Sequence, residues 1–212
     1  MPTLLTNRQI AALYKRLAAV IDPKPELRFS NNLELLVAVV LSAQTTDKAV
    51  NAVTPALFAR CPTPQAYLDL GEEGIAAATR TIGLYRNKAR SIVGLCRQLI
   101  ERHSGQVPGD RESLLALPGV GVKTANVVLN QGFGQPVIAV DTHIFRVSGR
   151  TGLAVEPTPE ATGETLMAIT PKRYLLDAHH YLLLHGRYTC TARKPNCGAC
   201  PIASICLKRN LE

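Results

Sequence analysis

Apolar positions recur with a helical period along most of the chain. A run from Leu33 to Ala43 is apolar on nearly all sides, which predicts a buried central helix. The sequence shows no sustained two-residue alternation of the kind that strands produce, so the pattern predicts an all-α fold. Near the start, one further helix is predicted from the spacing of Leu5, Ile10, Leu13, Tyr14, Leu17 and Val20. Asp22, Pro23 and Pro25 are expected to end it.

Glycine and proline residues separate the remaining predicted helices. After Pro136 the composition changes, and the apolar segment Val137 to Val140 leads into Asp141. Two short helices are expected around residues 117–121, the second running from residue 122 to about 130. The other predicted helices span residues 47–60, 64–70, 72–79, 87–103, 142–150, 159–169 and 174–186.

Size and charge narrow the class of protein. The 212 residues are 46% hydrophobic, enough for one large domain or two small ones. The longest apolar stretch, Leu33 to Leu41, is interrupted by Glu34 and is far shorter than the roughly 20 residues that cross a bilayer, so no membrane association is predicted. Met1 to Ile10 lacks the features of a leader, which predicts a cytoplasmic location. The net charge of +8 favours a polyanionic partner.

The six cysteines divide into a cluster and two single residues. Cys61 and Cys96 stand apart and are expected to be buried small apolar residues. The other four fall within 17 residues, a spacing compact enough for one metal centre, at Cys190, Cys197, Cys200 and Cys206. Four thiolates suit either tetrahedral zinc or a 4Fe-4S cluster. Between the first two cysteines, the basic loop with Arg193 and Lys194 could contact phosphates or offset the thiolate charge.

A second candidate site is the segment Leu117-Pro-Gly-Val-Gly-Val-Lys-Thr-Ala125. Gly119, Val120 and Gly121 would form a tight turn whose backbone NH groups face outward at a helix start, where they can hold a phosphate. The pattern matches the helix-hairpin-helix motif of DNA-binding proteins. Lys123 lies in the first helical turn, where a cation is disfavoured by the helix dipole. It could be a phosphate contact or, once deprotonated, an amine nucleophile.

A third candidate is Val140-Asp141-Thr142-His143. Asp141 stands directly before a predicted helix and could simply be its N-cap. It could also place a carboxylate beside the sugar of an extruded nucleotide and stabilise positive charge at C1′. His143 is interpreted as structural or as a DNA contact.

Together these segments resemble the endonuclease III family of DNA glycosylases. The resemblance covers essentially the whole sequence and rests on Leu41-Ser-Ala-Gln-Thr-Thr-Asp47, the hairpin with Lys123, Val140-Asp-Thr-His143 and the cysteine spacing. It implies an all-α fold with a six-helix domain at residues 25–135. It also implies a cluster domain built from residues 1–24 and 136–212, with the DNA-binding groove between the two domains.

The resemblance further implies a 4Fe-4S cluster on the four cysteines, mainly structural, with its basic loop on DNA. Lys123 would attack C1′ of a flipped nucleotide and expel the damaged base. The resulting Schiff base would collapse by β-elimination, with Asp141 assisting. In similar enzymes a glutamine at the position of Gln44 fills the gap in the duplex, and a leucine at the position of Leu84 enters the opposite strand. Without the resemblance, these two residues would be a helix-end amide and a core leucine.

The expected activity is therefore excision of oxidised pyrimidines, of the thymine glycol type, from duplex DNA by a monomer. Val122 and Leu115 depart from the family, which often has a basic and an acidic residue there. A mismatch glycosylase of the same superfamily is disfavoured by Lys123, whereas a pyrimidine-dimer glycosylase shares its lysine chemistry. A non-catalytic DNA-binding module that senses redox state is the alternative outside enzymes.

Overall fold

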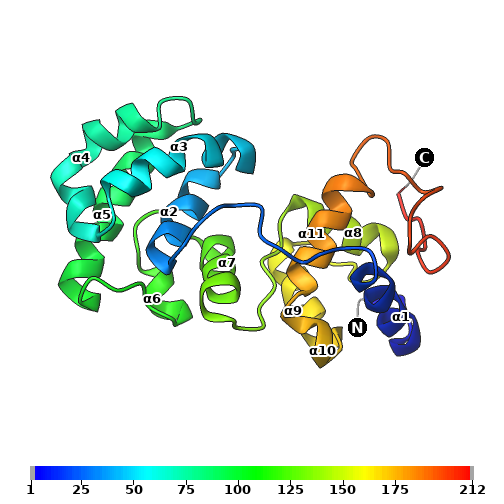
Figure 1. Ribbon diagram of the computed structural model, residues 1–212. Helices are drawn as coiled ribbons and strands as arrows, with labels where there is room; N and C mark the ends of the chain where they lie inside the picture. Colours follow the sequence, from blue (N-terminus) through cyan, green and yellow to red (C-terminus); the bar gives the residue numbers. More distant parts are fainter. Residues whose placement is uncertain (1–2, 211–212) are drawn as a thin grey trace. The chain divides into compact units, whose positions relative to one another are not determined.

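The structure, a computed structural model, describes residues 3–210. Over that range the chain forms eleven α-helices and no β-strand, which confirms the predicted all-α class (Figure 1). Within the same range, no helix is long and apolar enough to cross a membrane. The chain divides into two compact units. The six-helix unit is Pro25–Gly134, and the terminal unit joins the residues up to Lys24 with those from Gln135 onward.

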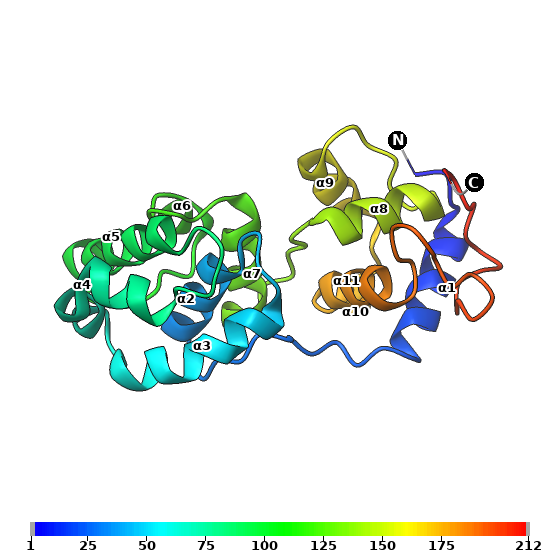
Figure 2. The same cartoon turned by 90° about the horizontal axis from the view of Figure 1, so that it is seen from above.

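The six-helix unit is built around one central helix. Its helices are α2 (Asn32–Ser42), α3 (Asp47–Arg60), α4 (Pro64–Ala78), α5 (Tyr85–His103), α6 (Arg111–Leu115) and α7 (Val122–Phe133). α2 packs against α3, α5 and α7, and Figure 2 shows it enclosed by its neighbours. All residues from Leu35 to Leu41 are buried. The predicted buried central helix is confirmed, because an element that is apolar on every side needs partners on every side.

Local sequence signals set most helix boundaries in this unit. Thr46 caps α3 by accepting a hydrogen bond from the Ala49 amide, and Thr63 caps α4 with Pro64 at its first position. Two helices were predicted at residues 64–70 and 72–79. The chain is helical on both sides of Gly71, whose φ of 69° produces a kink at the expected break.

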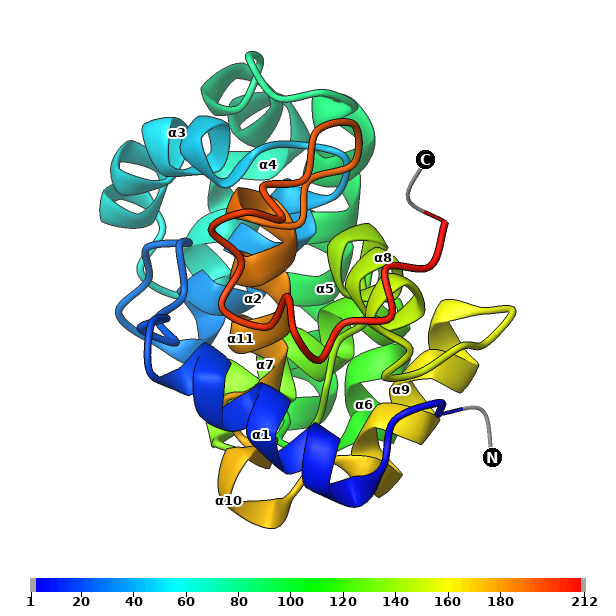
Figure 3. The same ribbon diagram turned by 90° about the vertical axis from the view of Figure 1, so that its right-hand side faces the viewer.

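The terminal unit joins both ends of the chain. Its helices are α1 (Asn7–Ala18), α8 (Thr142–Thr151), α9 (Pro159–Ile169), α10 (Lys172–Leu175) and α11 (Ala178–Tyr188). α1 packs on α11, and the Tyr14 hydroxyl lies 2.8 Å from Thr170 Oγ1 in the core. The Arg16 guanidinium donates a hydrogen bond to Ser204 Oγ at 2.6 Å, which joins α1 to the C-terminal coil beside it (Figure 3). The N-terminal helix is therefore part of this unit's core.

Two helix predictions were wrong in detail. Val20 was placed on the buried face of the first helix, but α1 ends at Ala18 and Val20 is 64% exposed. The helix predicted over residues 174–186 is divided between α10 and α11. The Asp177 amide turns back to the Tyr174 carbonyl, and the Tyr181 amide then bonds to the Asp177 carbonyl. Asp177 is the N-cap of α11 but makes no capping hydrogen bond with its side chain, and no glycine or proline marks the break in the sequence.

The two single cysteines are buried, as predicted. Cys61 is 1% exposed and Cys96 is fully buried. Burial raises the pKa of the Cys96 thiol to about 12 and also raises that of Cys61. Neither thiol therefore has the depressed pKa of a nucleophilic cysteine.

Candidate functional site

The predicted hairpin is formed by α6, a tight turn and α7. Gly119 has a φ of 78°, and a Cβ built at this residue would lie 2.6 Å from the Ser91 Cβ on α5. Only glycine combines this backbone with such a close approach. Val120 is buried and its amide donates to the Leu117 carbonyl at 3.1 Å, so Val120 holds the turn together from the inside. This bond closes the turn, and Gly119 and Gly121 are exposed on its outer side.

Lys123 is the second residue of α7. Gly121 is the N-cap of this helix and no side chain caps it, so the amides of the first turn face outward. The Lys123 side chain is exposed beside these amides. The arrangement places a primary amine next to a helix start that attracts anions, as the sequence predicted. The apolar side chains of Val122 and Leu115 are 39% and 37% exposed.

Asp141 is the N-cap of α8. Its Oδ1 accepts hydrogen bonds from the amides of His143 and Ile144, both at 2.9 Å. The helix start therefore fixes one carboxylate oxygen and the orientation of the group. This geometry is compatible with both interpretations from the sequence, because Oδ2 is not used by the cap.

His143 lies one turn before Arg146, which the sequence analysis did not single out. Arg146 Nη2 is 3.2 Å from His143 Nδ1, and the same guanidinium donates to the carbonyls of Gly186 at 2.7 Å and Cys190 at 3.1 Å. Arginine has no acceptor atom, so Nδ1 must accept and Nε2 carries the ring proton. Arg146 thus orients the His143 ring, and the Nε2 group of His143 is not used in this contact.

Gln44 and Leu84 share an unusual backbone. Gln44 lies in the turn between α2 and α3 with a φ of 54°, and Leu84 directly precedes α5 with a φ of 58°. Left-handed conformations are rare for residues with a Cβ and cluster at functional sites. Both side chains are exposed, with Leu84 57% exposed. Leu84 is therefore not the core leucine of the alternative interpretation.

Lys88 links the two segments that carry Gln44 and Leu84, and sequence reasoning missed it. Its Nζ donates to the Leu41 carbonyl at 2.9 Å and to Thr45 Oγ1 at 2.8 Å. The sequence did contain an indication of this role. Lys88 shares a helical period with three apolar residues of the same face, and all four are buried: Lys88, Ile92, Cys96 and Leu99. A lysine on the apolar face of a helix usually has a specific partner.

The four clustered cysteines line one cavity in the terminal unit. All four are free thiols, and besides them the wall includes His185 and Ile202. Burial lowers the pKa of His185 to about 4, so a neutral imidazole faces the Cys200 sulfur at 3.7 Å. Four thiolates converging on one mainly apolar space suit an iron-sulfur cluster, which is held by cysteine sulfur.

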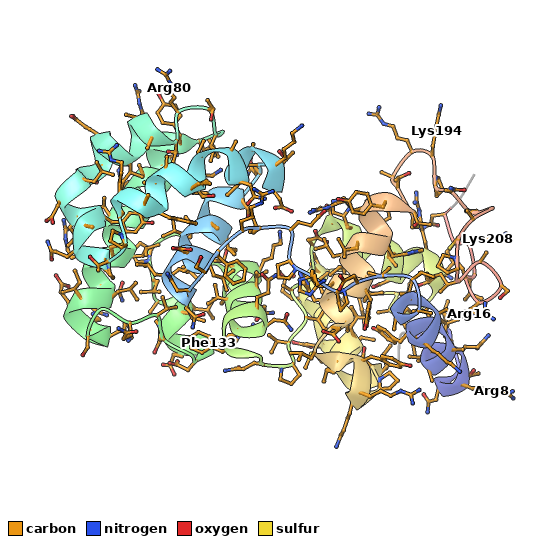
Figure 4. The ribbon with its side chains drawn as sticks, viewed as in Figure 1. Arg8, Arg16, Arg80, Phe133, Lys194 and Lys208 are labelled. Atoms are coloured by element: carbon orange, nitrogen blue, oxygen red, sulfur yellow. The ribbon has the colours of Figure 1, made fainter. Side chains whose placement is uncertain are left out.

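The loop from Cys190 to Cys197 is held by Arg150, a second residue that sequence reasoning missed. Its guanidinium donates to the carbonyls of Thr191 at 2.6 Å and Ala192 at 2.7 Å. Because these contacts bind the backbone, the side chains of Arg193 and Lys194 remain exposed. Lys194 projects outward from the loop in Figure 4.

The structure brings some of the predicted residues together. The four cysteines converge on one cavity, with Arg193 and Lys194 on the loop beside it. The hairpin with Lys123 belongs to the six-helix unit, as do Gln44 and Leu84. Asp141 and His143 belong to the terminal unit.

Two family models match the chain. Residues 37–172 match the HhH-GPD superfamily of base excision DNA repair proteins. Residues 190–206, from the first to the last clustered cysteine, match the iron-sulfur binding domain of endonuclease III.

Individual relatives give the same result. Endonuclease III of Treponema pallidum (strain Nichols) is 53% identical over 209 residues, covering 98% of this chain and 99% of the relative. Endonuclease III of Escherichia coli (strain K12) is 55% identical over 184 residues, covering 87% of each. Among solved structures, a trapped endonuclease III-DNA covalent intermediate matches with a TM-score of 0.92 and 46% identity. That match covers 97% of both chains.

These matches confirm three predictions made from the sequence. The chain is a base excision repair DNA glycosylase with AP lyase activity, it carries one 4Fe-4S cluster, and its partner is DNA. The match across nearly the full length agrees with the hairpin and the cysteine cavity described above. The chain therefore belongs to the endonuclease III family.

Proposed function

We propose that this protein removes oxidised pyrimidines of the thymine glycol type from duplex DNA, with Lys123 as the nucleophile. The observation that carries the proposal is an exposed lysine amine in the uncapped first turn of α7, directly after the Gly119–Gly121 turn. A phosphate held by the outward-facing amides would place the neighbouring deoxyribose within reach of that amine.

The reaction would proceed in balanced steps. The Lys123 nitrogen donates its electron pair to C1′, the glycosidic bond breaks, and the base leaves with that bond's electrons and gains a proton. The sugar ring opens to give the Schiff base. Loss of a proton from C2′ then expels the 3′ phosphate, and water releases the enzyme. An amine attacks only when unprotonated, and Lys123 is exposed, so DNA bound over the turn would have to exclude water from it.

Asp141 would act on charge and protons during these steps. Its carboxylate is oriented by two amides through Oδ1, which leaves Oδ2 for the reacting sugar. A fixed negative charge near C1′ would stabilise the positive charge that develops as the base departs. We expect Asp141→Asn to keep the α8 cap and DNA binding but to lower the rate of base removal by roughly 100-fold or more. Single-turnover excision and a binding titration would measure the two effects.

Gln44 and Leu84 would occupy the duplex after base extrusion. Their exposure and left-handed backbones support this role, because strain is retained where the geometry is needed. Gln44 would fill the gap and Leu84 would enter the opposite strand. Together they would offset the stacking lost when a base leaves the helix.

The remaining predicted contacts would hold the DNA backbone. Gly119, Val120 and Gly121 form the turn, and Arg193 and Lys194 present positive charge on the cluster loop. His143 would offer its Nε2 donor. Such contacts set register without reading sequence, so binding should weaken as salt concentration rises. We propose that the protein acts as a monomer on cytoplasmic DNA without membrane association; a stable dimer in sedimentation would contradict the monomer.

The test uses duplex DNA with a single thymine glycol and compares wild type with Lys123→Ala and Lys48→Ala. Lys48 is an exposed lysine of the same unit, so its variant controls for the loss of one positive charge. We expect strand cleavage and borohydride trapping with wild type and Lys48→Ala, and neither with Lys123→Ala. Cleavage only at a mismatch or a pyrimidine dimer would overturn the lesion assignment. Binding without any product would favour a non-catalytic, redox-sensing module.

A further inference from the structure

Lys88 is a buried cation without a carboxylate partner in the described part of the chain. It is the fourth residue of α5 and is only 6% exposed. Its two hydrogen-bond acceptors are neutral, the Leu41 carbonyl at 2.9 Å and Thr45 Oγ1 at 2.8 Å. Burial lowers the pKa of the Lys88 amine. Burying a charge costs free energy. If the residue at this position only filled space, an apolar side chain would give a more stable fold.

The acceptors lie on both sides of Gln44. Leu41 is in the last turn of α2, where its carbonyl has no helical partner and a cation is favoured. Thr45 closes the turn, since its amide donates to the Ser42 carbonyl at 3.0 Å and its hydroxyl to the Ala43 carbonyl at 3.3 Å. Gln44 has no hydrogen bond within the described residues. Lys88 thus holds both ends of the turn while the Gln44 amide stays available.

Lys88 is connected to Leu84 as well. The Lys88 amide donates to the Leu84 carbonyl at 3.1 Å, which is the first helical bond of α5. On the other side of Leu84, Ile82 is 2% exposed and its amide bonds to the Thr79 carbonyl at 2.9 Å. The Leu84 loop is therefore fixed at both ends, and the Lys88 side chain joins it to the Gln44 turn.

We infer that Lys88 is a positioning residue that locks the Gln44 turn to the Leu84 loop, so that both side chains enter the duplex as one preformed unit. The inference rests on the proposed gap-filling roles of Gln44 and Leu84. Each of these residues has a left-handed backbone that would relax if its segment were loose. A rigid link removes the cost of ordering two loops during base extrusion.

The inference predicts which activities depend on Lys88. Cleavage at a damaged base in duplex DNA requires extrusion and gap filling. Cleavage at an abasic site in single-stranded DNA requires only Lys123 chemistry, because there is no duplex to open. A loss of general structure would lower both activities together. Loss of positioning should lower only the duplex activity.

The test compares Lys88→Met with Lys48→Met, which loses the same charge at an exposed site. Lys88→Met should lower single-turnover excision in duplex DNA by roughly 10- to 100-fold relative to Lys48→Met. Cleavage of the single-stranded abasic substrate should change less than about twofold beyond the control, for the same reason. A 2-aminopurine next to the lesion should show less unstacking with Lys88→Met. Equal losses on both substrates would overturn the inference.

A double-mutant cycle shows whether Lys88 acts through Gln44. If it does, Lys88→Met should have little further effect on duplex excision in the Gln44→Ala background. Full additivity would overturn the inference. Thr45→Val removes one acceptor of Lys88, together with the hydroxyl's own bond to the Ala43 carbonyl, and keeps every charge. It should give a smaller loss in the same direction, and it replaces Lys88→Met as the test if that variant does not fold. If wild type does not act on thymine glycol, the proposed lesion fails, and the variants are compared on a duplex abasic site.

Discussion

The two units hold their site residues by different means. In the six-helix unit, α2 is buried from Leu35 to Leu41, and the turn that follows it is fixed by this core and by one buried cation. In the terminal unit, the described residues after Thr189 form neither helix nor strand. That C-terminal coil is held by the side chains of Arg16 and Arg150 and by the burial of Ile202 and Ile205, and its four cysteines line one cavity.

The two units therefore differ in what positions their functional side chains. Helix packing places Lys123, and helix packing together with the buried Lys88 places the two insertion residues, so that neither arrangement needs a ligand. The coil buries Ile202 and Ile205 in the core of the terminal unit, but without regular structure its backbone groups need other partners. The basic loop should therefore depend on the cluster, whereas the hairpin should not.

The largest effect is expected from removing one cluster ligand. Cys197→Ser should lose most of its bound iron and destabilise the terminal unit by more than about 4 kcal/mol, because loss of a metal site exceeds ordinary substitutions. Iron content and chemical denaturation would measure this. Cys61→Ser is the matched control, since a serine there can keep the bond to the Ala66 carbonyl. Equal iron loss in both variants would contradict the assignment.

The two glycines of the hairpin should respond differently to alanine. Gly119→Ala should lower the free energy of unfolding by about 2–4 kcal/mol. The alanine would have to adopt a left-handed backbone conformation, and its Cβ would overlap with Ser91. Gly121→Ala should change the free energy of unfolding by no more than about 0.5 kcal/mol, since the φ of Gly121 is −96° and nothing lies within 4 Å of the added Cβ. Urea denaturation gives both values. Similar costs at the two positions would mean that the turn is not held as described.

Two buried tyrosines allow a comparison between the units. Tyr14→Phe removes a buried hydroxyl bonded to Thr170 and should cost about 1 kcal/mol. The Tyr67 hydroxyl is buried and has no hydrogen-bond partner in the described residues, so Tyr67→Phe should be neutral or stabilise by up to about 1 kcal/mol. Thermal unfolding of both variants would test the sign of the difference. A matching loss for Tyr67→Phe would reveal an unrecognised partner.

The smallest effect concerns backbone strain at Leu84. Leu84→Gly should raise stability by about 0.5–1 kcal/mol, because glycine accepts a φ of 58° without penalty. Leu84→Ala keeps the Cβ and should not gain. Both variants should excise damaged bases more slowly in duplex DNA, since the inserting side chain is gone. Stability and single-turnover assays on the same preparations would separate the two effects.

The fold was largely predictable because its signals are local. Residues 47–60 and 159–169 were predicted as helices, and they match α3 and α9, each of which is preceded by a capping threonine. The division of residues 174–186 was not predictable, because Asp177 interrupts the helix without glycine or proline. The exposure of Val20 was missed because the apolar period continues past the end of α1.

The candidate site was predictable where chemistry follows spacing in the sequence. The four cysteines and the hairpin glycines are of that kind, since their separation along the chain defines their geometry. The roles of Lys88 and Arg150 were missed because they bind backbone carbonyls 47 and 41 residues away in sequence. The left-handed backbone conformations of Gln44 and Leu84 could not be predicted either, since neither residue type favours that conformation.

The most direct test of the lysine chemistry is to locate the covalent bond. Wild-type protein is reduced with borohydride on thymine glycol duplex DNA, digested with protease and analysed by mass spectrometry. The account predicts a single sugar adduct, on the peptide that contains Lys123. An adduct on another amine, or strand cleavage without any adduct, would contradict it.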